Sequence, residues 1–278
     1  MRRYSPASFP PEHFAAEQPR LSGIAKALWL GLGTIGLVLA VNQSSVAYGG
    51  VASVLGVEER WNPRLDRGPR GRFVRSTVNG LIGEELRRDH PHLAIEMGVR
   101  RDGRDVALTR DGVAAAFPAA TPRLVVFGHG LCETEDHWNH RRGALGTTYG
   151  EMLAGHGWTP VFVRANTGLS VRENGVALTA VLQRLVEAWP GDVERIALVG
   201  HSMGGLIARA ALGVRADLAP GEAAWADRVS DLVCLSTPHL GAPLARGAAR
   251  GMAALNLLPE SRAFGTILDR RSLGIRDL

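Results

Sequence analysis

The chain has 278 residues, of which 45% are hydrophobic and 21% charged. This balance is typical of a globular protein with one sizeable core and excludes a mainly disordered chain. The formal net charge is +5, and the only arginine-rich segment, residues 60–75, is diluted by Glu58, Glu59 and Asp66. We interpret this segment as a solvated linker, and we expect no nucleic-acid partner.

The N-terminal part of the chain divides into a polar tail and an apolar run. Residues 1–22 are rich in Pro, Ser, Arg and Glu and are expected to be disordered. The apolar run begins at Ile24 and ends at Val41, slightly short of what a membrane-spanning helix prefers. Glu12 and Glu17 precede it, which is unlike a signal peptide. A packed or interfacial helix and a single membrane span both stay open, so we expect a cytoplasmic or a membrane-associated protein.

Residues 23–90 are expected to form a helical N-terminal extension, and residues 91–278 a separate α/β domain. Val78, Leu81, Ile82 and Leu86 recur at helical spacing, which predicts a helix over residues 74–88. Residues 94–99 and 106–109 then flank an Asp-Gly pair, Asp102 and Gly103, that favours a tight turn. The sheet is therefore predicted to begin with an antiparallel hairpin.

Beyond Pro122, short apolar segments alternate with helical ones. We expect strands at residues 124–127, 160–163, 195–199 and 229–235, and helices at residues 145–155, 171–189 and 206–212. Strands this apolar are buried on both faces. The pattern predicts a mostly parallel, doubly wound sheet.

The strand at residues 195–199 runs directly into a glycine-rich turn. The turn and the start of the next helix read Gly200, His201, Ser202, Met203, Gly204 and Gly205. A nucleophilic serine needs such a sharp strand-to-helix turn, where Gly200 and Gly204 avoid collisions with neighbouring backbone. The helix that follows favours negative charge at its N-terminus. We therefore predict that Ser202 is a catalytic nucleophile.

A second motif follows the strand at residues 124–127 and reads Gly128, His129, Gly130 and Leu131. It places a loop at the edge of the sheet where an oxyanion hole takes one of its donors. We predict the backbone N–H groups of Leu131 and Met203 as the donor pair. His129 precedes Ser202, so we interpret its imidazole as a structural group of the loop and not as a base.

These motifs resemble the α/β-hydrolases, in particular the lipase and esterase group that includes GPI inositol-deacylase-like proteins. A third matching segment lies at residues 236–243, with His239 in it. The resemblance implies hydrolysis of an ester or lipid-like small molecule. The sequence has no zinc-binding, Walker-type or dinucleotide-binding motif, so we expect neither a metal nor a cofactor. The resemblance also implies a triad in the order serine, acid, histidine.

The segment after Ser202 is short for that triad, and His239 is its only histidine. We expect a domain that is C-terminally incomplete and lacks its last strands, with the acid and base outside this chain or with His239 as an altered base. Without a base, activity is expected to be low. A catalytically impaired binding or membrane-associated protein and an acyltransferase are the alternative functions.

Overall fold

A computed structural model describes residues 68–140, 142–214, 224–240 and 273–277, which belong to one compact unit. The predicted tail and the apolar run that ends at Val41 lie outside these residues. Within the described ranges, no helix has both the length and the apolar character needed to cross a bilayer.

The centre of the unit is a six-stranded sheet with the order β2-β1-β4-β3-β5-β6. Its strands are β1 (Gly98–Arg101), β2 (Arg104–Asp105), β3 (Arg123–Gly128), β4 (Thr159–Arg164), β5 (Arg195–His201) and β6 (Val229–Leu235). Strands β4, β3, β5 and β6 run parallel, whereas β1 pairs antiparallel with both β2 and β4. The predicted fold, a mostly parallel sheet that begins with an antiparallel hairpin, is confirmed.

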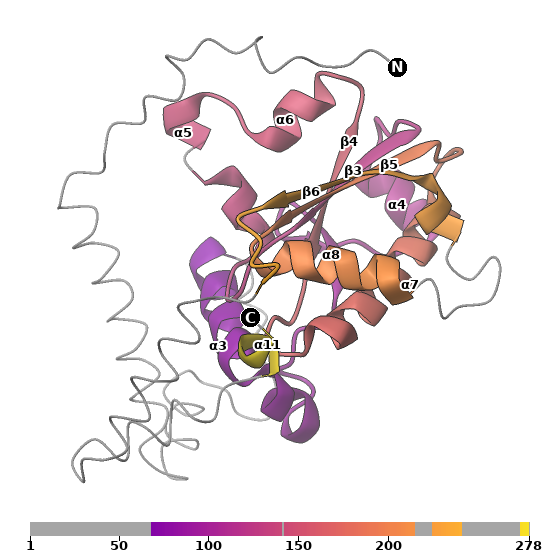
Figure 1. Cartoon of the computed structure of the whole chain (residues 1–278). Coiled ribbons are helices and arrows are strands. Elements are labelled where there is room, and N and C mark those ends of the chain that lie inside the picture. The colour runs from indigo at the N-terminus through magenta and orange to yellow at the C-terminus, as the bar shows by residue number, and fades with distance from the viewer. Residues whose placement is uncertain (1–67, 141, 215–223, 241–272, 278) are drawn as a thin grey trace, which may run out of the picture. The chain divides into compact units, whose positions relative to one another are not determined.

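Helices cover both faces of this sheet (Figure 1). They are α3 (Pro69–Asp89), α4 (Arg110–Ala116), η4 (Glu135–Asn139), α5 (Arg142–Leu145), α6 (Tyr149–Ala154), α7 (Val171–Ala188), α8 (Met203–Val214), η6 (Ala224–Arg228) and α11 (Leu273–Arg276). On one face, α7 and α8 bury Leu182 and Ile207 against strand residues such as Leu198. On the other, Trp138 of η4 packs against Phe127, which belongs to a second buried cluster with Val199. The alternation of side chains along each buried strand explains this division.

Several element boundaries differ from the expectation. The hairpin forms around Asp102 and Gly103, both with positive φ, but its strands are shorter and lie closer to the turn than predicted: residues 98–101 instead of 94–99, and residues 104–105 instead of 106–109. The segment predicted as its second strand ends at Thr109, whose side chain instead caps α4 by accepting a hydrogen bond from the backbone N–H of Gly112. The helix expected over residues 145–155 begins only at Tyr149, because Thr148 caps the start of α6, and the separate helix α5 ends at Leu145.

Helix α3 buries only Leu86 of the apolar stripe on which its prediction depended. Val78, Leu81 and Ile82 are only partly buried. The fully buried positions are mostly polar or small: Arg72, Ser76, Thr77, Asn79, Gly80, Gly83 and Leu86. Glycines let α3 approach closely, since a Cβ atom at Gly80 would overlap Cys132 and one at Gly83 would overlap Asn166. Helix α3 thus packs on the loops that follow β3 and β4.

Arg72 corrects the interpretation of the arginine-rich segment as a solvated linker. The helix begins at Pro69, and Arg72 on its first turn is buried. Its guanidinium donates two hydrogen bonds to Asp136, at 2.8 and 2.9 Å. A buried arginine needs such a carboxylate partner, and this pairing between residues far apart in the chain cannot be recognised from local composition.

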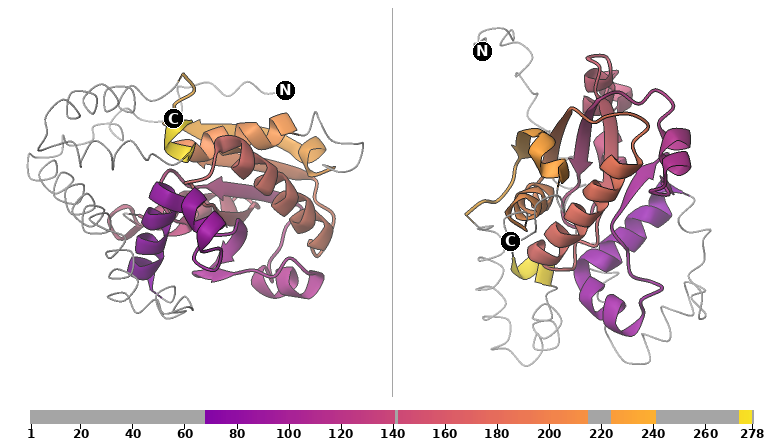
Figure 2. Two further views of the ribbon diagram at one scale, coloured as in Figure 1. Left: turned by 90° about the horizontal axis from the view of Figure 1, so that it is seen from below. Right: turned by 90° about the vertical axis from the view of Figure 1, so that its right-hand side faces the viewer.

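The short helix α11 lies beside α3 and the start of α7 (Figure 2). The backbone N–H of Leu273 donates to Glu84 at 3.1 Å, and Asp277 accepts a hydrogen bond of 2.7 Å from the backbone N–H of Val171. Val171 is the first residue of α7, where a carboxylate is favoured by the free N–H groups of the helix end. Residues near both ends of the described unit therefore meet at the loop between β4 and α7.

Candidate active site

Ser202 lies at the turn between β5, which ends at His201, and α8, which begins at Met203. Its φ of +50° is unusual for a residue with a side chain and marks a sharp left-handed turn. The backbone N–H of Ser202 donates to the carbonyl of Leu235 at 2.8 Å, so the end of β6 supports the turn. This is the strand-turn-helix geometry that the sequence predicts for residue 202.

Two glycines allow the close packing around this turn. A Cβ atom at Gly200 would overlap the backbone nitrogen of Gly205, and one at Gly204 would overlap the carbonyl oxygen of Gly128. Only glycine therefore fits at either position without moving backbone. The N-terminus of α8 is pressed against the ends of β5 and β3.

The loop after β3 lies directly against Ser202. A Cβ atom placed on Gly130 would come within 3.1 Å of the Cβ atom of Ser202. Among the described residues, neither the backbone N–H of Leu131 nor that of Met203 has a hydrogen-bond acceptor. The loop after β3 and the start of α8 thus each present, beside Ser202, one backbone N–H that has no acceptor among the described residues.

The His129 side chain is almost completely buried, with 2% of its surface exposed. Its Nε2 accepts a hydrogen bond from the backbone N–H of Ala165 at 3.0 Å, so its Nδ1 carries the proton and donates to the carbonyl of Gly130 at 2.9 Å. Burial lowers the pKa of His129 and outweighs the nearby backbone carbonyl and carboxylates. A neutral imidazole therefore links the β3 loop to the end of β4.

The lowered pKa of His129 leads to a prediction of how the stability of the protein changes with pH. Because its pKa is lower in the folded than in the unfolded protein, only the unfolded state binds this proton between the two pKa values. The contribution of His129 to the free energy of unfolding should therefore fall as the pH drops below about 6.5, by at most about 1.4 kcal/mol per pH unit. Urea unfolding between pH 5 and 7.5 should show this slope in the wild type and a shallower one in His129→Gln. Equal slopes would contradict the assignment.

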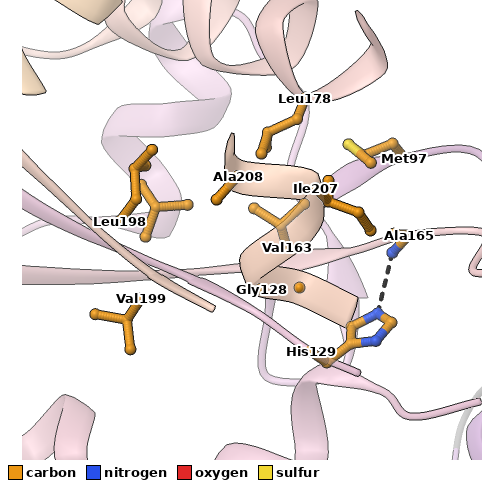
Figure 3. Close-up of a pocket in the computed structure, with 12 residues that line it drawn as sticks. Met97, Gly128, His129, Val163, Ala165, Leu178, Leu198, Val199, Ile207 and Ala208 are labelled. Carbon is orange, nitrogen blue, oxygen red and sulfur yellow. Dashed lines mark hydrogen bonds between the residues drawn. The ribbon is translucent and has the colours of Figure 1, made fainter. Parts of the chain in front are cut away.

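A small cavity of about 20 Å³ lies between the sheet and helices α7 and α8 (Figure 3). Its walls are mainly apolar side chains, including Met97, Val163, Leu178 and Ile207. His129 borders it, but both ring nitrogens already have backbone partners. An apolar void of this size belongs to the core and offers no room for a substrate.

Glu133 and His201 form a contact beside the serine that the sequence analysis did not anticipate. The carboxylate oxygen Oε2 of Glu133 lies 3.0 Å from Nδ1 of His201 and accepts a hydrogen bond of 2.7 Å from the backbone N–H of Gly130. Partial burial raises the pKa of Glu133, but the hydrogen bonds from Gly130 and His201 outweigh it, so this pKa lies below its ordinary value. Glu133 is therefore ionised at neutral pH.

Cys132, in the loop after β3, carries a second nucleophilic side chain near the Ser202 turn. Burial raises the pKa of its thiol to about 12, so at neutral pH it is protonated and unreactive. Its backbone N–H is engaged with the Thr167 hydroxyl at 3.0 Å. These contacts favour a packing role for Cys132 and leave Ser202 as the candidate nucleophile.

No base contacts the serine in the part of the chain that the structure describes, since the Ser202 hydroxyl has no hydrogen-bond partner there. His239 lies after β6, exposed, with its Nδ1 2.7 Å from Nη1 of Arg209. Arginine can only donate, so Nδ1 of His239 accepts. A triad histidine instead donates from Nδ1 to a carboxylate, so this geometry does not favour His239 as the base.

Metal ligands are not grouped within the described ranges: no three His, Cys, Asp or Glu side chains are placed to hold an ion.

The fold places the chain in the α/β-hydrolase class, with a mixed, mostly parallel sheet and flanking helices. The family model described as "Putative serine esterase (DUF676)" matches residues 119–278, and the chain belongs to this family. The predicted resemblance to esterases is confirmed at this level, whereas the closer likeness to GPI inositol-deacylases stays a prediction. A comparison with curated proteins finds no match. Membership of the family indicates ester hydrolysis.

Proposed function

We propose that the protein hydrolyses carboxylic esters, with Ser202 as nucleophile and the backbone N–H groups of Leu131 and Met203 as the oxyanion hole. The observation that carries this proposal is the left-handed turn at Ser202, flanked by two amides without acceptors among the described residues. Free amides held in place before reaction stabilise negative charge without reorganisation. The N-terminus of α8 adds a favourable dipole.

The reaction follows from these positions. The Ser202 oxygen attacks the ester carbonyl carbon, the carbonyl oxygen becomes the oxyanion, and the serine proton passes through a base to the departing alcohol. Water then attacks the acyl-serine, releasing the acid and restoring the hydroxyl. We infer that the base is His239 after release from Arg209, or a group that the described part of the structure does not include.

A fluorophosphonate probe tests the assignment of the nucleophile, because it phosphonylates only an activated serine. We expect one modified peptide, and fragmentation should place the added mass on Ser202. A control esterase treated in parallel verifies the probe. If the control is labelled while Ser202 stays unmodified, the proposed nucleophile is wrong.

A second candidate function is a hydrolase-fold protein that binds its ligand without turnover. One observation favours it, namely that no described residue offers a base to the Ser202 hydroxyl. Steady hydrolysis of p-nitrophenyl esters above the buffer rate would exclude it. An acyltransferase uses the same acyl-serine and differs only in the acceptor, so a product analysis with added alcohol separates that function from hydrolysis.

A further inference from the structure

One carboxylate oxygen joins the two segments that would form the oxyanion hole. Oε2 of Glu133 receives the backbone N–H of Gly130 at 2.7 Å and lies 3.0 Å from Nδ1 of His201. Gly130 is in the loop after β3, and His201 is the last residue of β5. The side chain of Glu133 is 22% exposed, so water competes only partly for these contacts. We call this arrangement the Glu133 bridge.

The bridge accounts for the direction of the loop amides. The N–H of Gly130 points to Glu133, that of Cys132 to the Thr167 hydroxyl, and that of Glu133 to the carbonyl of Gly130. Of the amides from residue 130 to 133, only that of Leu131 has no acceptor among the described residues. The hydrogen bonds on both sides of Leu131 therefore fix the orientation of its N–H.

The bridge is also close to the serine itself. A Cβ atom placed on Gly130 would lie 3.0 Å from Oε2 of Glu133 and 3.1 Å from the Cβ atom of Ser202. The backbone of Glu133 is held in turn by α3, because its carbonyl accepts a hydrogen bond from the Ser76 hydroxyl. The hydrogen bond from Ser76 thus holds the backbone of Glu133 in place, and the Glu133 carboxylate connects the loop after β3 with the turn that contains Ser202.

We propose that Glu133 is a positioning residue for ester hydrolysis: its carboxylate holds the β3 loop against the Ser202 turn and so aims the Leu131 N–H at the oxyanion. This inference rests on the proposed function. Glu133 does not touch the reacting atoms. Its role is to keep a donor in the geometry that the transition state needs, where a displacement of about 1 Å can cost about 100-fold in rate.

Three substitutions of Glu133 distinguish the effect of its side-chain length from the effect of its charge. Glu133→Ala removes the bridge, and kcat for a p-nitrophenyl ester should fall by about 10- to 100-fold with KM changed by less than about threefold. Glu133→Gln keeps the length and an accepting oxygen, so it should recover most of this loss. Glu133→Asp keeps the charge but is shorter by one methylene, so it should behave like Glu133→Ala.

Glu151 provides a matched control, because it too accepts the backbone N–H of the residue three positions earlier, Thr148, at 2.9 Å. It caps α6, and Glu151→Ala should leave kcat near the wild-type value. Wild-type kcat in Glu133→Ala would overturn the proposal. Equal impairment of Glu133→Gln and Glu133→Ala would overturn it as well, because the charge would then be what matters.

The outcome remains decisive if Glu133→Ala fails to fold, since the comparison of Glu133→Gln with Glu133→Asp then carries the test. Circular dichroism and thermal unfolding identify the folded variants. The rate of fluorophosphonate labelling separates this proposal from the proposed function. An unlabelled wild type refutes Ser202 as nucleophile, whereas equal labelling rates in wild type and folded Glu133→Asp refute only the bridge.

Discussion

Replacing Ser202 by alanine should reduce kcat for ester hydrolysis by at least about 1,000-fold. The substitution removes the attacking oxygen, so the covalent route is lost and only binding and the oxyanion hole remain to accelerate attack by water. KM should change little, because the serine hydroxyl contributes mainly to the reaction step. Initial rates with p-nitrophenyl esters over a range of concentrations measure both constants.

Ser236 offers a control with similar backbone geometry. It follows β6, and its φ of +52° is close to that of Ser202. Alanine at Ser236 bears the same backbone strain but should retain most of the activity. A loss below about tenfold in Ser202→Ala would show that another group performs the chemistry.

Replacing Glu135 by alanine should destabilise the protein by about 3–5 kcal/mol. The Glu135 carboxylate is buried and accepts hydrogen bonds from Arg164, whose Nε lies 2.7 Å from it, and from Arg100, whose Nε lies 3.3 Å from it. Both arginines are buried as well. Without the carboxylate, their positive charges lose much of their compensation in a poorly solvated site. Urea unfolding monitored by tryptophan fluorescence gives the free energy directly.

An exposed ion pair gives the comparison for this measurement. Asp231 lies 3.4 Å from Arg195, and both side chains are 51% exposed. Asp231→Ala should change the free energy of unfolding by no more than about 1 kcal/mol, since solvent screens such pairs. Similar effects of the two substitutions would mean that water compensates the arginines around Glu135.

The sheet was predictable because its signals are local and strong. Residues 124–127 and 195–199 are apolar runs of strand length, and the turn at Asp102 and Gly103 has a composition that favours positive φ. Helix α4 escaped prediction because it is short and contains Gly112. The capping hydroxyl of Thr109 was the available signal for its start.

The candidate site was predictable only in part, for a physical reason. The glycines around Ser202 are required by steric crowding at the strand-to-helix turn, so the sequence motif is enough to identify them. The Glu133 bridge and the arginines around Glu135 depend on contacts between distant segments, and a charged residue looks the same in a sequence whether it is buried or solvated. The roles of Glu133 and Glu135 therefore became visible only in the structure.

The region that the family model matches does not include every element that supports the candidate site, because helix α3 lies before it. The family match covers residues 119–278, whereas α3 spans Pro69–Asp89 and touches the β3 loop through Ser76 and Gly80. A side chain larger than glycine at residue 80 would press on Cys132, two positions from Gly130. Substitutions upstream of the shared region can thus alter the geometry around Ser202, and transplanting the shared region alone would leave that loop without its outer support.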